Sequence, residues 1–265
     1  MKHSVTTTGL YVYAIIPAEG IAANELPKGI DGHALQIVST HGLAAIVHEA
    51  APEPYQGPDS EVKRWILQHS DVVDAVWEKL GTVLPMTFNV IVAPDTTTEQ
   101  SPEQRLQNWL SDSAEPIRTQ LETLRDRVEL RVDISLDEET ATTQDPELVE
   151  LRAGIDSRPA GVQRLYRKRL EERTRNVAER IADDLYPQFR KRLIALAEDL
   201  AENPRPARQQ GSVTVLNASL LVHRQAVEAV GLELADIRDH QPGAQIRFLG
   251  PWPPYSFSEL PSFEE

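Results

Sequence analysis

Histidine is the side chain in this sequence best suited to bind a metal or to transfer protons near neutral pH. No two histidines stand four apart on one predicted helix, the spacing that presents two ligands to zinc. His48 and Glu49 begin a zinc-protease motif, but proline occupies position 52, where the second histidine would stand. His69 falls on the apolar side of a predicted helix, where a buried histidine with one backbone partner is the common outcome. We expect no metal, no cofactor and no catalytic histidine.

Paired carboxylates are the other candidates for acid–base chemistry, and they occur at Glu138-Glu139, Glu171-Glu172 and Asp183-Asp184. Adjacent residues on a helix do not face one another, and Glu171-Glu172 lies among basic residues, where ion pairing along the surface is the simpler account. The sequence contains no cysteine, which excludes thiol nucleophiles and disulfides. It also lacks the serine elbow of hydrolases, the P-loop and the dinucleotide-binding glycine pattern. These absences argue against catalysis without disproving it, because an active site can be assembled from distant residues.

The charge of the chain argues against nucleic acid as a partner. Its 41 acidic and 27 basic residues give a formal net charge of −14, whereas binding to a phosphate backbone requires clustered lysine and arginine. The most basic stretch, RLYRKRLEERTR at 164–175, contains two glutamates and is interpreted as the solvated face of a helix. Only 6 of the basic residues are lysines, a composition compatible with a high-salt cytoplasm or with an ordinary acidic protein from a GC-rich genome.

The first part of the chain alternates strand-like and helix-like patterns. Residues 9–17 are rich in aromatic and β-branched side chains and predict a strand, and residues 34–50 predict two strands that turn at His41-Gly42. Residues 62–80 place apolar side chains three and four apart, which predicts a helix facing a sheet. Residues 83–92 predict a returning strand.

The second part begins with a helix start signal, because Ser101-Pro102-Glu103-Gln104 has the form of a capping box. Residues 128–136 predict a half-exposed strand. Residues 162–200 predict a long helix that Pro187 should kink or divide. The remaining elements are a central strand, a helix and a last strand, at 212–224, 225–238 and 245–250.

These elements predict an α+β protein of two domains, since 265 residues suffice for two medium-sized cores. We place an N-terminal mixed α+β domain at 1–98, a C-terminal ferredoxin-like domain with a long helical segment at 99–249, and a C-terminal tail rich in proline and aromatic residues at 250–265. The ferredoxin-like arrangement needs one more strand than the pattern shows. No apolar run approaches the roughly 18 residues that span a bilayer, so we expect a cytoplasmic protein without a membrane span.

Two segments are more distinctive than these general features. Residues 84–92 read LPMTFNVIV after a histidine-containing helix, and residues 250–257 read GPWPPYSF. Both resemble the GvpF/GvpL family of gas vesicle proteins, in which such a helix leads to a strand reading L-P-x-R-F-G and the C-terminus carries W-P-P-Y-x-F. The opening strand and residues 160–173 are similar to further segments of that family, in the expected order.

The motif strand of that family corresponds here to Leu84, Pro85 and Phe88. Thr87 stands where the family usually has arginine, and Asn89 stands where it usually has glycine. Any role of that arginine is therefore in doubt for this chain.

The tail motif matches fully, and its aromatic residues are Trp252, Tyr255 and Phe257. We predict that the tail docks on the protein, because its prolines restrict the backbone and leave less entropy to lose. In a polyproline II conformation, Trp252 and Tyr255 would share one face and Trp252 would be buried. The other hypothesis is a mobile tail whose aromatic residues bind a partner.

The resemblance implies a non-enzymatic accessory protein for gas vesicle assembly and buoyancy. It implies contact with the small hydrophobic shell protein GvpA or with other accessory Gvp proteins, and a location at the gas vesicle or in the cytoplasm. The alternative from another functional class is a small-molecule-binding enzyme or sensor, with a site between the sheet of a ferredoxin-like domain and the helix at 160–175.

Overall fold

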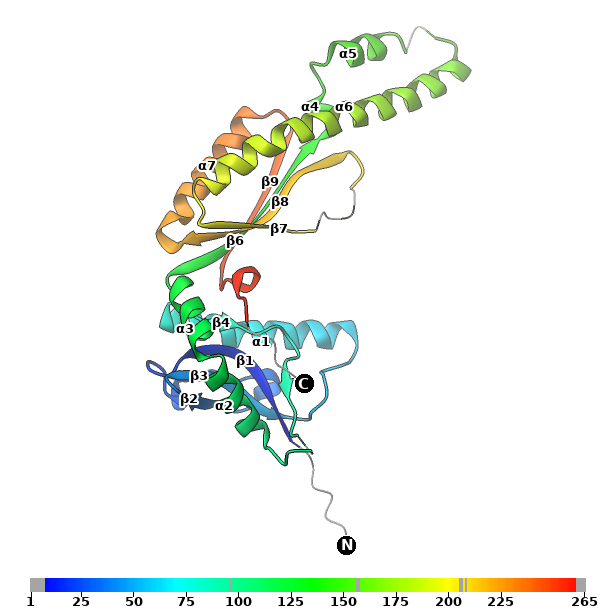
Figure 1. Ribbon diagram of the computed structural model, residues 1–265. Coiled ribbons are helices and arrows are strands. Elements are labelled where there is room, and N and C mark those ends of the chain that lie inside the picture. The colour runs from blue at the N-terminus through cyan, green and yellow to red at the C-terminus, as the bar shows by residue number, and fades with distance from the viewer. Residues whose placement is uncertain (1–7, 96, 156–157, 205–206, 208, 261–265) are drawn as a thin grey trace. The chain divides into compact units, whose positions relative to one another are not determined.

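The computed structural model describes residues 8–260 apart from 96, 156–157, 205–206 and 208 (Figure 1). It has the predicted α+β class, with two antiparallel sheets in two compact units. Unit 1 comprises the described residues of 1–128 and 252–265, and unit 2 those of 129–251. The domain ranges 1–98 and 99–249 remain a prediction, because a grouping by contacts does not test which parts fold independently.

Unit 1 is built on a five-stranded sheet whose central strand is β1, Gly9–Pro17. Its strand order is β2-β3-β1-β4, and β5 pairs with another part of β1. The other strands are β2 (Gln36–Thr40), β3 (Leu43–Ala50), β4 (Leu84–Pro85) and β5 (Ile91–Val92). Residues 9–16 of β1 are buried on both faces of the sheet, which explains why this strand is apolar or aromatic at almost every position.

The turn between β2 and β3 lies where the sequence predicts it. His41 and Gly42 have φ values of 48° and 78°, and Thr40 pairs with Leu43 across the turn. Two central residues with positive φ match the twist of an antiparallel hairpin, and glycine adopts this conformation without a steric cost.

Helices cover both faces of this sheet, with α1 (Asp59–Leu80) on one side and α2 (Pro102–Asp112) and α3 (Ala114–Thr123) on the other (Figure 1). Helix α1 ends at Gly81, which has a φ of 69° and donates its N–H to the carbonyl of Trp77. Ile66, predicted on the apolar stripe, is 40% exposed. The buried side chains are Trp65, His69, Val72, Val73, Val76 and Trp77.

The capping box at Ser101 is confirmed, because its side chain accepts the N–H of Gln104 and the Gln104 side chain accepts the N–H of Ser101. The prediction of one strand at 83–92 is wrong. This segment forms the two-residue strands β4 and β5, separated by an irregular stretch in which Asn89 has a φ of 74°. A left-handed residue cannot continue a strand, and Pro85 has no N–H to extend the ladder.

Unit 2 contains a four-stranded sheet in the order β7-β8-β6-β9, with β8 in the interior as predicted. Helices α6 and α7 lie on one face of this sheet (Figure 1). The strands are β6 (Arg127–Asp137), β7 (Asp199–Glu202), β8 (Ser212–His223) and β9 (Ala244–Trp252). The helices are α4 (Glu138–Ala141), α5 (Pro146–Ala153), α6 (Ala160–Ile194) and α7 (Val227–His240).

The long helical prediction at 162–200 needs two corrections. Pro187 does not divide α6, and the kink that was the other expected outcome stays a prediction. Pro187 lies on an exposed side of the helix, and the Gln188 side chain donates to the carbonyl of Asp184 at 3.0 Å. Leu200 is not helical. It belongs to β7 and pairs with Leu220 of β8, which supplies the strand that the sequence pattern did not show.

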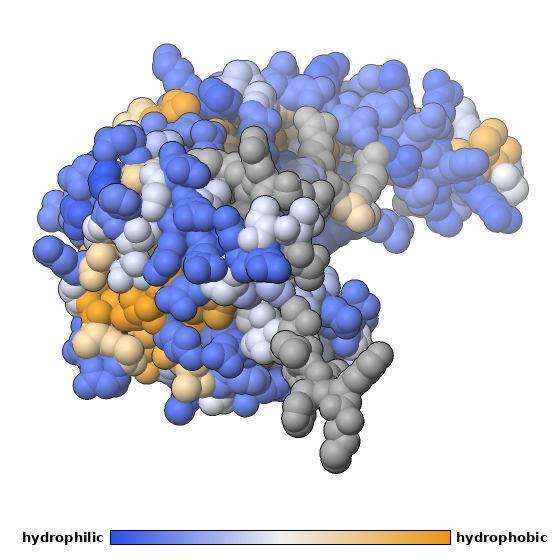
Figure 2. Space-filling view, turned by 60° about the horizontal axis from the view of Figure 1, so that its bottom comes forward, coloured by the Kyte–Doolittle hydropathy of each residue, from blue (hydrophilic) through white to orange (hydrophobic). Residues whose placement is uncertain are grey.

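The surface seen in Figure 2 is mainly hydrophilic, with a patch of hydrophobic residues toward the lower left. This agrees with the formal net charge of −14. The most exposed large hydrophobic side chains are Leu67 on α1, Leu165 on α6 and Leu232 on α7. Exposed apolar residues of this kind are candidates for contact with a partner.

Candidate functional site

The motif strand residues lie inside unit 1. Leu84 and Pro85 are buried and pair with Ile15 and Ala14 of β1. Phe88 is half-buried, and its ring centroid lies 6.2 Å from that of His69. These three residues therefore contribute to packing, whereas Thr87 between them is exposed.

Asn89 fixes the irregular stretch that follows Phe88. Its φ of 74° places it in the left-handed region, which asparagine tolerates better than most residues other than glycine. Its side chain accepts the N–H of Tyr55 at 2.9 Å and donates to the carbonyl of Tyr55 at 3.1 Å. Asn89 thus holds the segment between β3 and α1 against the motif strand.

A buried network of tyrosine and histidine lies behind this stretch. The hydroxyl of Tyr11 is 2.9 Å from Nδ1 of His69 and accepts the N–H of Asn89 at 3.2 Å. Nε2 of His69 lies 3.0 Å from the carbonyl oxygen of Met86, which can only accept. His69 must therefore carry its proton on Nε2, and Nδ1 accepts from Tyr11. The network joins β1, α1 and the motif strand.

Further aromatic groups surround this network. Tyr13 accepts the N–H of Ile30 at 2.8 Å, and Nε2 of His48 lies 3.0 Å from the hydroxyl of Tyr55. The rings of Tyr11 and His48 have centroids 5.1 Å apart, as expected for cross-strand neighbours on β1 and β3.

The electrostatics of this cluster favour neutral side chains. Burial lowers the pKa of His69 to about 4. Burial, and then the neighbouring His33, lower the pKa of His48 to about 4 as well, although Asp31 acts in the opposite direction. Burial also raises the pKa of Tyr11 and Tyr13 above the ordinary tyrosine value. At neutral pH the cluster holds no charged acid or base, so its chemistry is that of a hydrogen-bonded core.

The tail residues differ in their surroundings. Phe257 is buried, Tyr255 is half-buried and Trp252 is 39% exposed, so the expected burial of Trp252 is wrong. The backbone explains the difference, because Trp252 is the last residue of β9 whereas Tyr255–Phe257 form a single 3-10 turn rather than a polyproline II segment. Pro253 and Pro254 are buried.

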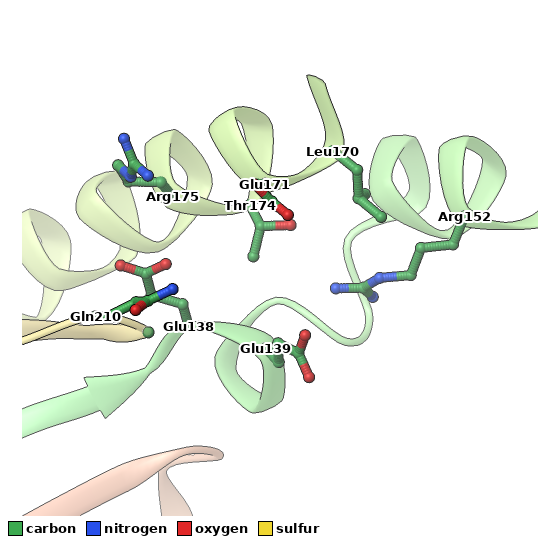
Figure 3. Close-up of a pocket in the computed structure, with 9 residues that line it drawn as sticks. Glu138, Glu139, Arg152, Leu170, Glu171, Thr174, Arg175 and Gln210 are labelled. Atoms are coloured by element: carbon green, nitrogen blue, oxygen red, sulfur yellow. The ribbon is translucent and has the colours of Figure 1, made fainter. Parts of the chain in front are cut away.

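Unit 2 has a cleft of about 570 Å³ beside α6. Figure 3 shows Glu138 and Glu139 of α4 in the lower part of the view, Thr174 and Arg175 of α6 above them, and Arg152 of α5 reaching in from the right. The cleft therefore mixes carboxylates and guanidinium groups, which suits a polar or charged segment of a protein better than a simple ion. A second cleft, of about 350 Å³, lies between α5 and α6.

No metal or membrane feature accompanies these sites. Among the described residues, no group of three or more histidine or carboxylate side chains is arranged to hold a metal ion. Within the same part of the chain, no helix is long and apolar enough to cross a membrane.

Comparison with known proteins decides the family. The model of the family described as gas vesicle synthesis protein GvpL/GvpF matches residues 9–259. The chain belongs to the GvpL/GvpF family of gas vesicle proteins. This family consists of structural and accessory gas vesicle proteins, not of enzymes.

Individual relatives agree with this membership. Gas vesicle protein L1 of Halobacterium salinarum is 28% identical, with 97% of this chain and 92% of the relative covered. Gas vesicle protein L2 of the same organism is 30% identical, with 94% and 91% covered. The crystal structure of GvpF from Anabaena has a similar fold, with a TM-score of 0.68 at 20% identity and coverage of 98% of this chain and 99% of that one.

Asn89 is one of the two departures from the L-P-x-R-F-G pattern that residues 84–89 resemble. Its left-handed φ is a conformation that glycine adopts without steric cost, so the glycine of that pattern would also fit here. The roles of Tyr11 and Tyr55 were not predicted, because residues 11 and 55 lie far from residue 89 in sequence and only the fold brings them together. The departure from glycine at position 89 was the one available signal.

Proposed function

We propose that this protein is an accessory factor in gas vesicle assembly that binds the hydrophobic shell protein GvpA or other accessory Gvp proteins. The match of the GvpL/GvpF model to residues 9–259 carries this proposal. The match extends over the described parts of both units. The proposal is therefore supported by the sequence of both units and not by one short motif alone. We place the protein at the gas vesicle or in the cytoplasm.

The physical need for such a factor follows from the shell. A shell protein with an extended apolar face aggregates unless a partner covers that face or an open strand edge before assembly. This chain has the surface such a partner requires, because its charge of −14 opposes self-association while apolar residues remain exposed at a few places.

The edge strand β9 is one surface that supports this proposal. Among the described residues of unit 2 it pairs with β6 and with no other strand, so its outer backbone groups can accept another strand. Phe248 and Leu249 of β9 are exposed. In the tail, Trp252 is 39% exposed. Trp252 and Tyr255 of the tail are therefore proposed as partner contacts, and Phe257 as a structural anchor.

We further propose that unit 2 is a ferredoxin-like domain. The succession β6, α4–α6, β7, β8, α7, β9 has the β-α-β-β-α-β order of that architecture, and the spatial order β7-β8-β6-β9 supports it.

Deletion of the gene in its source organism tests the function. We expect absent or malformed gas vesicles, seen by electron microscopy and by loss of buoyancy, and rescue by the intact gene. Co-purification of tagged protein with GvpA from the rescued strain identifies the partner. Normal buoyant vesicles in the deletion strain would contradict the proposal.

A further inference from the structure

The first half of α6 extends beyond the four-stranded sheet of unit 2 together with α5 (Figure 1). No side chain from residue 160 to 173 is buried, which corresponds to about four helical turns. The buried side chains of α6 begin at Thr174 and include Val177, Ala178, Ala182, Phe189 and Leu193. We call α5 with residues 158–173 the arm. A helix that contributes so little to the core has its surface available for another contact.

The arm has the opposite charge to the rest of the chain. The arm contains seven basic and four acidic side chains, a net +3. The chain as a whole carries −14, so everything outside the arm carries −17. Such a local reversal produces an attractive field for carboxylates on a molecule that otherwise repels them.

Apolar side chains are exposed on the same arm. Leu165 is 66% exposed and Val162, one turn before it, is 38% exposed. Arg169 follows Leu165 by four residues, so these three side chains are neighbours on one helical face. A partner that fits this face needs apolar groups as well as negative charge.

The cleft between α5 and α6 gives the arm a defined shape. Arg158, Tyr166, Arg169 and Arg173 line its volume of about 350 Å³. The Arg158 guanidinium carbon lies 3.9 Å from the centre of the Tyr166 ring, and Arg173 pairs with Glu147 of α5. Stacking and pairing orient these guanidinium groups, and a planar guanidinium of fixed direction recognises carboxylates through two parallel hydrogen bonds.

We infer that the arm is the docking surface for an acidic, apolar-bearing helical segment of a partner protein, an inference that rests on the proposed role in assembly. Charge complementarity selects this partner over others. A nucleic acid backbone offers no apolar group to the exposed Val162 and Leu165, whereas a protein segment that bears both carboxylates and apolar side chains matches the whole face. A membrane surface would require a longer apolar face than Val162 and Leu165 provide.

Binding of a synthetic helical peptide to the full chain tests the inference. The probe is a fluorescein-labelled peptide of repeating leucine and glutamate with helical spacing, and its matched control replaces every glutamate by lysine. We expect the acidic peptide to bind, measured by fluorescence anisotropy, even though the chain is net negative. Binding should weaken as KCl is raised, because exposed charges are screened.

Variants locate the site. The double variant Arg158→Gln/Arg169→Gln and the single variant Leu165→Ser should each weaken acidic-peptide binding, the double variant by roughly tenfold or more. The matched control is Arg118→Gln/Arg125→Gln, which removes two exposed arginines near α3 in unit 1. These arm residues are not buried, so the variants should keep the wild-type melting temperature.

Equal acidic-peptide binding by the wild type and by the arm variants would overturn the inference. Tighter binding of the lysine peptide than of the acidic peptide would also overturn it. So would displacement of the labelled acidic peptide by short duplex RNA or by phosphatidylglycerol vesicles at a lower concentration than the unlabelled acidic peptide requires. If these results occur while gene deletion still abolishes gas vesicles, the docking surface is disproved and the assembly function stands.

Discussion

At the scale of single residues, Asn89 combines a left-handed backbone with side-chain hydrogen bonds. Glycine reaches a φ near 74° without steric cost, but it cannot form side-chain hydrogen bonds. Asparagine accepts a modest conformational cost and gains two hydrogen bonds to the backbone of Tyr55. The segment before α1 is thus tied to the motif strand by a contact that glycine lacks.

Replacing Asn89 separates these two contributions. Asn89→Gly loses two hydrogen bonds and relieves the backbone, so we expect a loss of roughly 1–2 kcal/mol in the free energy of unfolding. Asn89→Ala loses the same bonds and keeps a disfavoured backbone, so we expect a larger loss, roughly 2–4 kcal/mol. Urea unfolding measures both. An alanine variant more stable than the glycine variant would show that the left-handed conformation is not maintained.

The buried histidines predict a pH dependence of stability. The pKa values of His48 and His69 are about 4 in the folded protein, against 6.5 for an ordinary histidine. Between these values the unfolded chain binds more protons than the folded one, so stability is complete above about pH 6.5 and falls as the pH is lowered toward 4. Each histidine contributes at most roughly 3 kcal/mol to this loss.

Thermal unfolding between pH 4 and pH 8 measures the effect. His69→Phe should make the melting temperature less dependent on pH in this window, although it also removes the hydrogen bonds to Tyr11 and Met86. The control His240→Gln replaces an exposed histidine on α7 that lies next to Asp236, so it separates the effect of an exposed histidine from that of the buried network. A melting temperature that does not change between pH 6.5 and pH 4.5 would contradict the prediction.

At the scale of elements, the sequence predicted correctly the strands, turns and helix ends that depend on residues adjacent in sequence. The strand at 9–17, the turn at His41-Gly42, the stop at Gly81 and the capping box at Ser101 depend on neighbours in sequence, and all are confirmed. The network around His69 could not be predicted beyond a buried histidine with one backbone partner, because its other members come from β1 and from the motif strand.

Two elements were predicted wrongly for one common reason. Leu200 continues the helical period of α6, and residues 83–92 have strand-like composition, so periodicity and propensity alone assigned both incorrectly. Pairing with Leu220 makes Leu200 part of a strand, and the positive φ of Asn89 interrupts the predicted strand. Tertiary pairing decided where local preference was ambiguous.

The tail turn provides a prediction at this scale. Phe257 is buried, and removal of a buried phenylalanine ring typically costs about 3–5 kcal/mol, so Phe257→Ala should lower the melting temperature strongly. Trp252 is 39% exposed, so Trp252→Ala should lower the melting temperature much less than Phe257→Ala does. The Trp252→Ala variant can therefore be used to test whether this side chain contributes to partner binding. Equal, small effects of both variants would favour the hypothesis of a tail that docks only on a partner.

At the scale of the whole molecule, charge is the dominant feature outside the two cores. The chain has 41 acidic and 27 basic residues. Ion pairs such as Lys79–Glu25 are exposed and contribute little to stability, so the excess of carboxylates is not neutralised by pairing. The folded protein therefore carries a net repulsion that the more expanded unfolded chain relieves.

Added salt should act on this repulsion, and we expect the melting temperature to rise from low to multimolar KCl. The Debye length falls from about 10 Å at 0.1 M to about 3 Å at 1 M, so repulsion between dispersed carboxylates is screened over this range. Salt also weakens the exposed ion pairs, but each exposed pair contributes little to stability. Asp183→Asn/Asp184→Asn removes two exposed charges on α6 and should raise stability at low salt while reducing the gain from KCl.

Because screening is nearly complete near 1 M, a continued rise toward 3 M KCl requires salt-dependent hydration of the acidic surface, as in a protein adapted to a high-salt cytoplasm. A plateau near 1 M instead identifies simple screening in an ordinary acidic protein, and an unchanged or lower melting temperature throughout contradicts both.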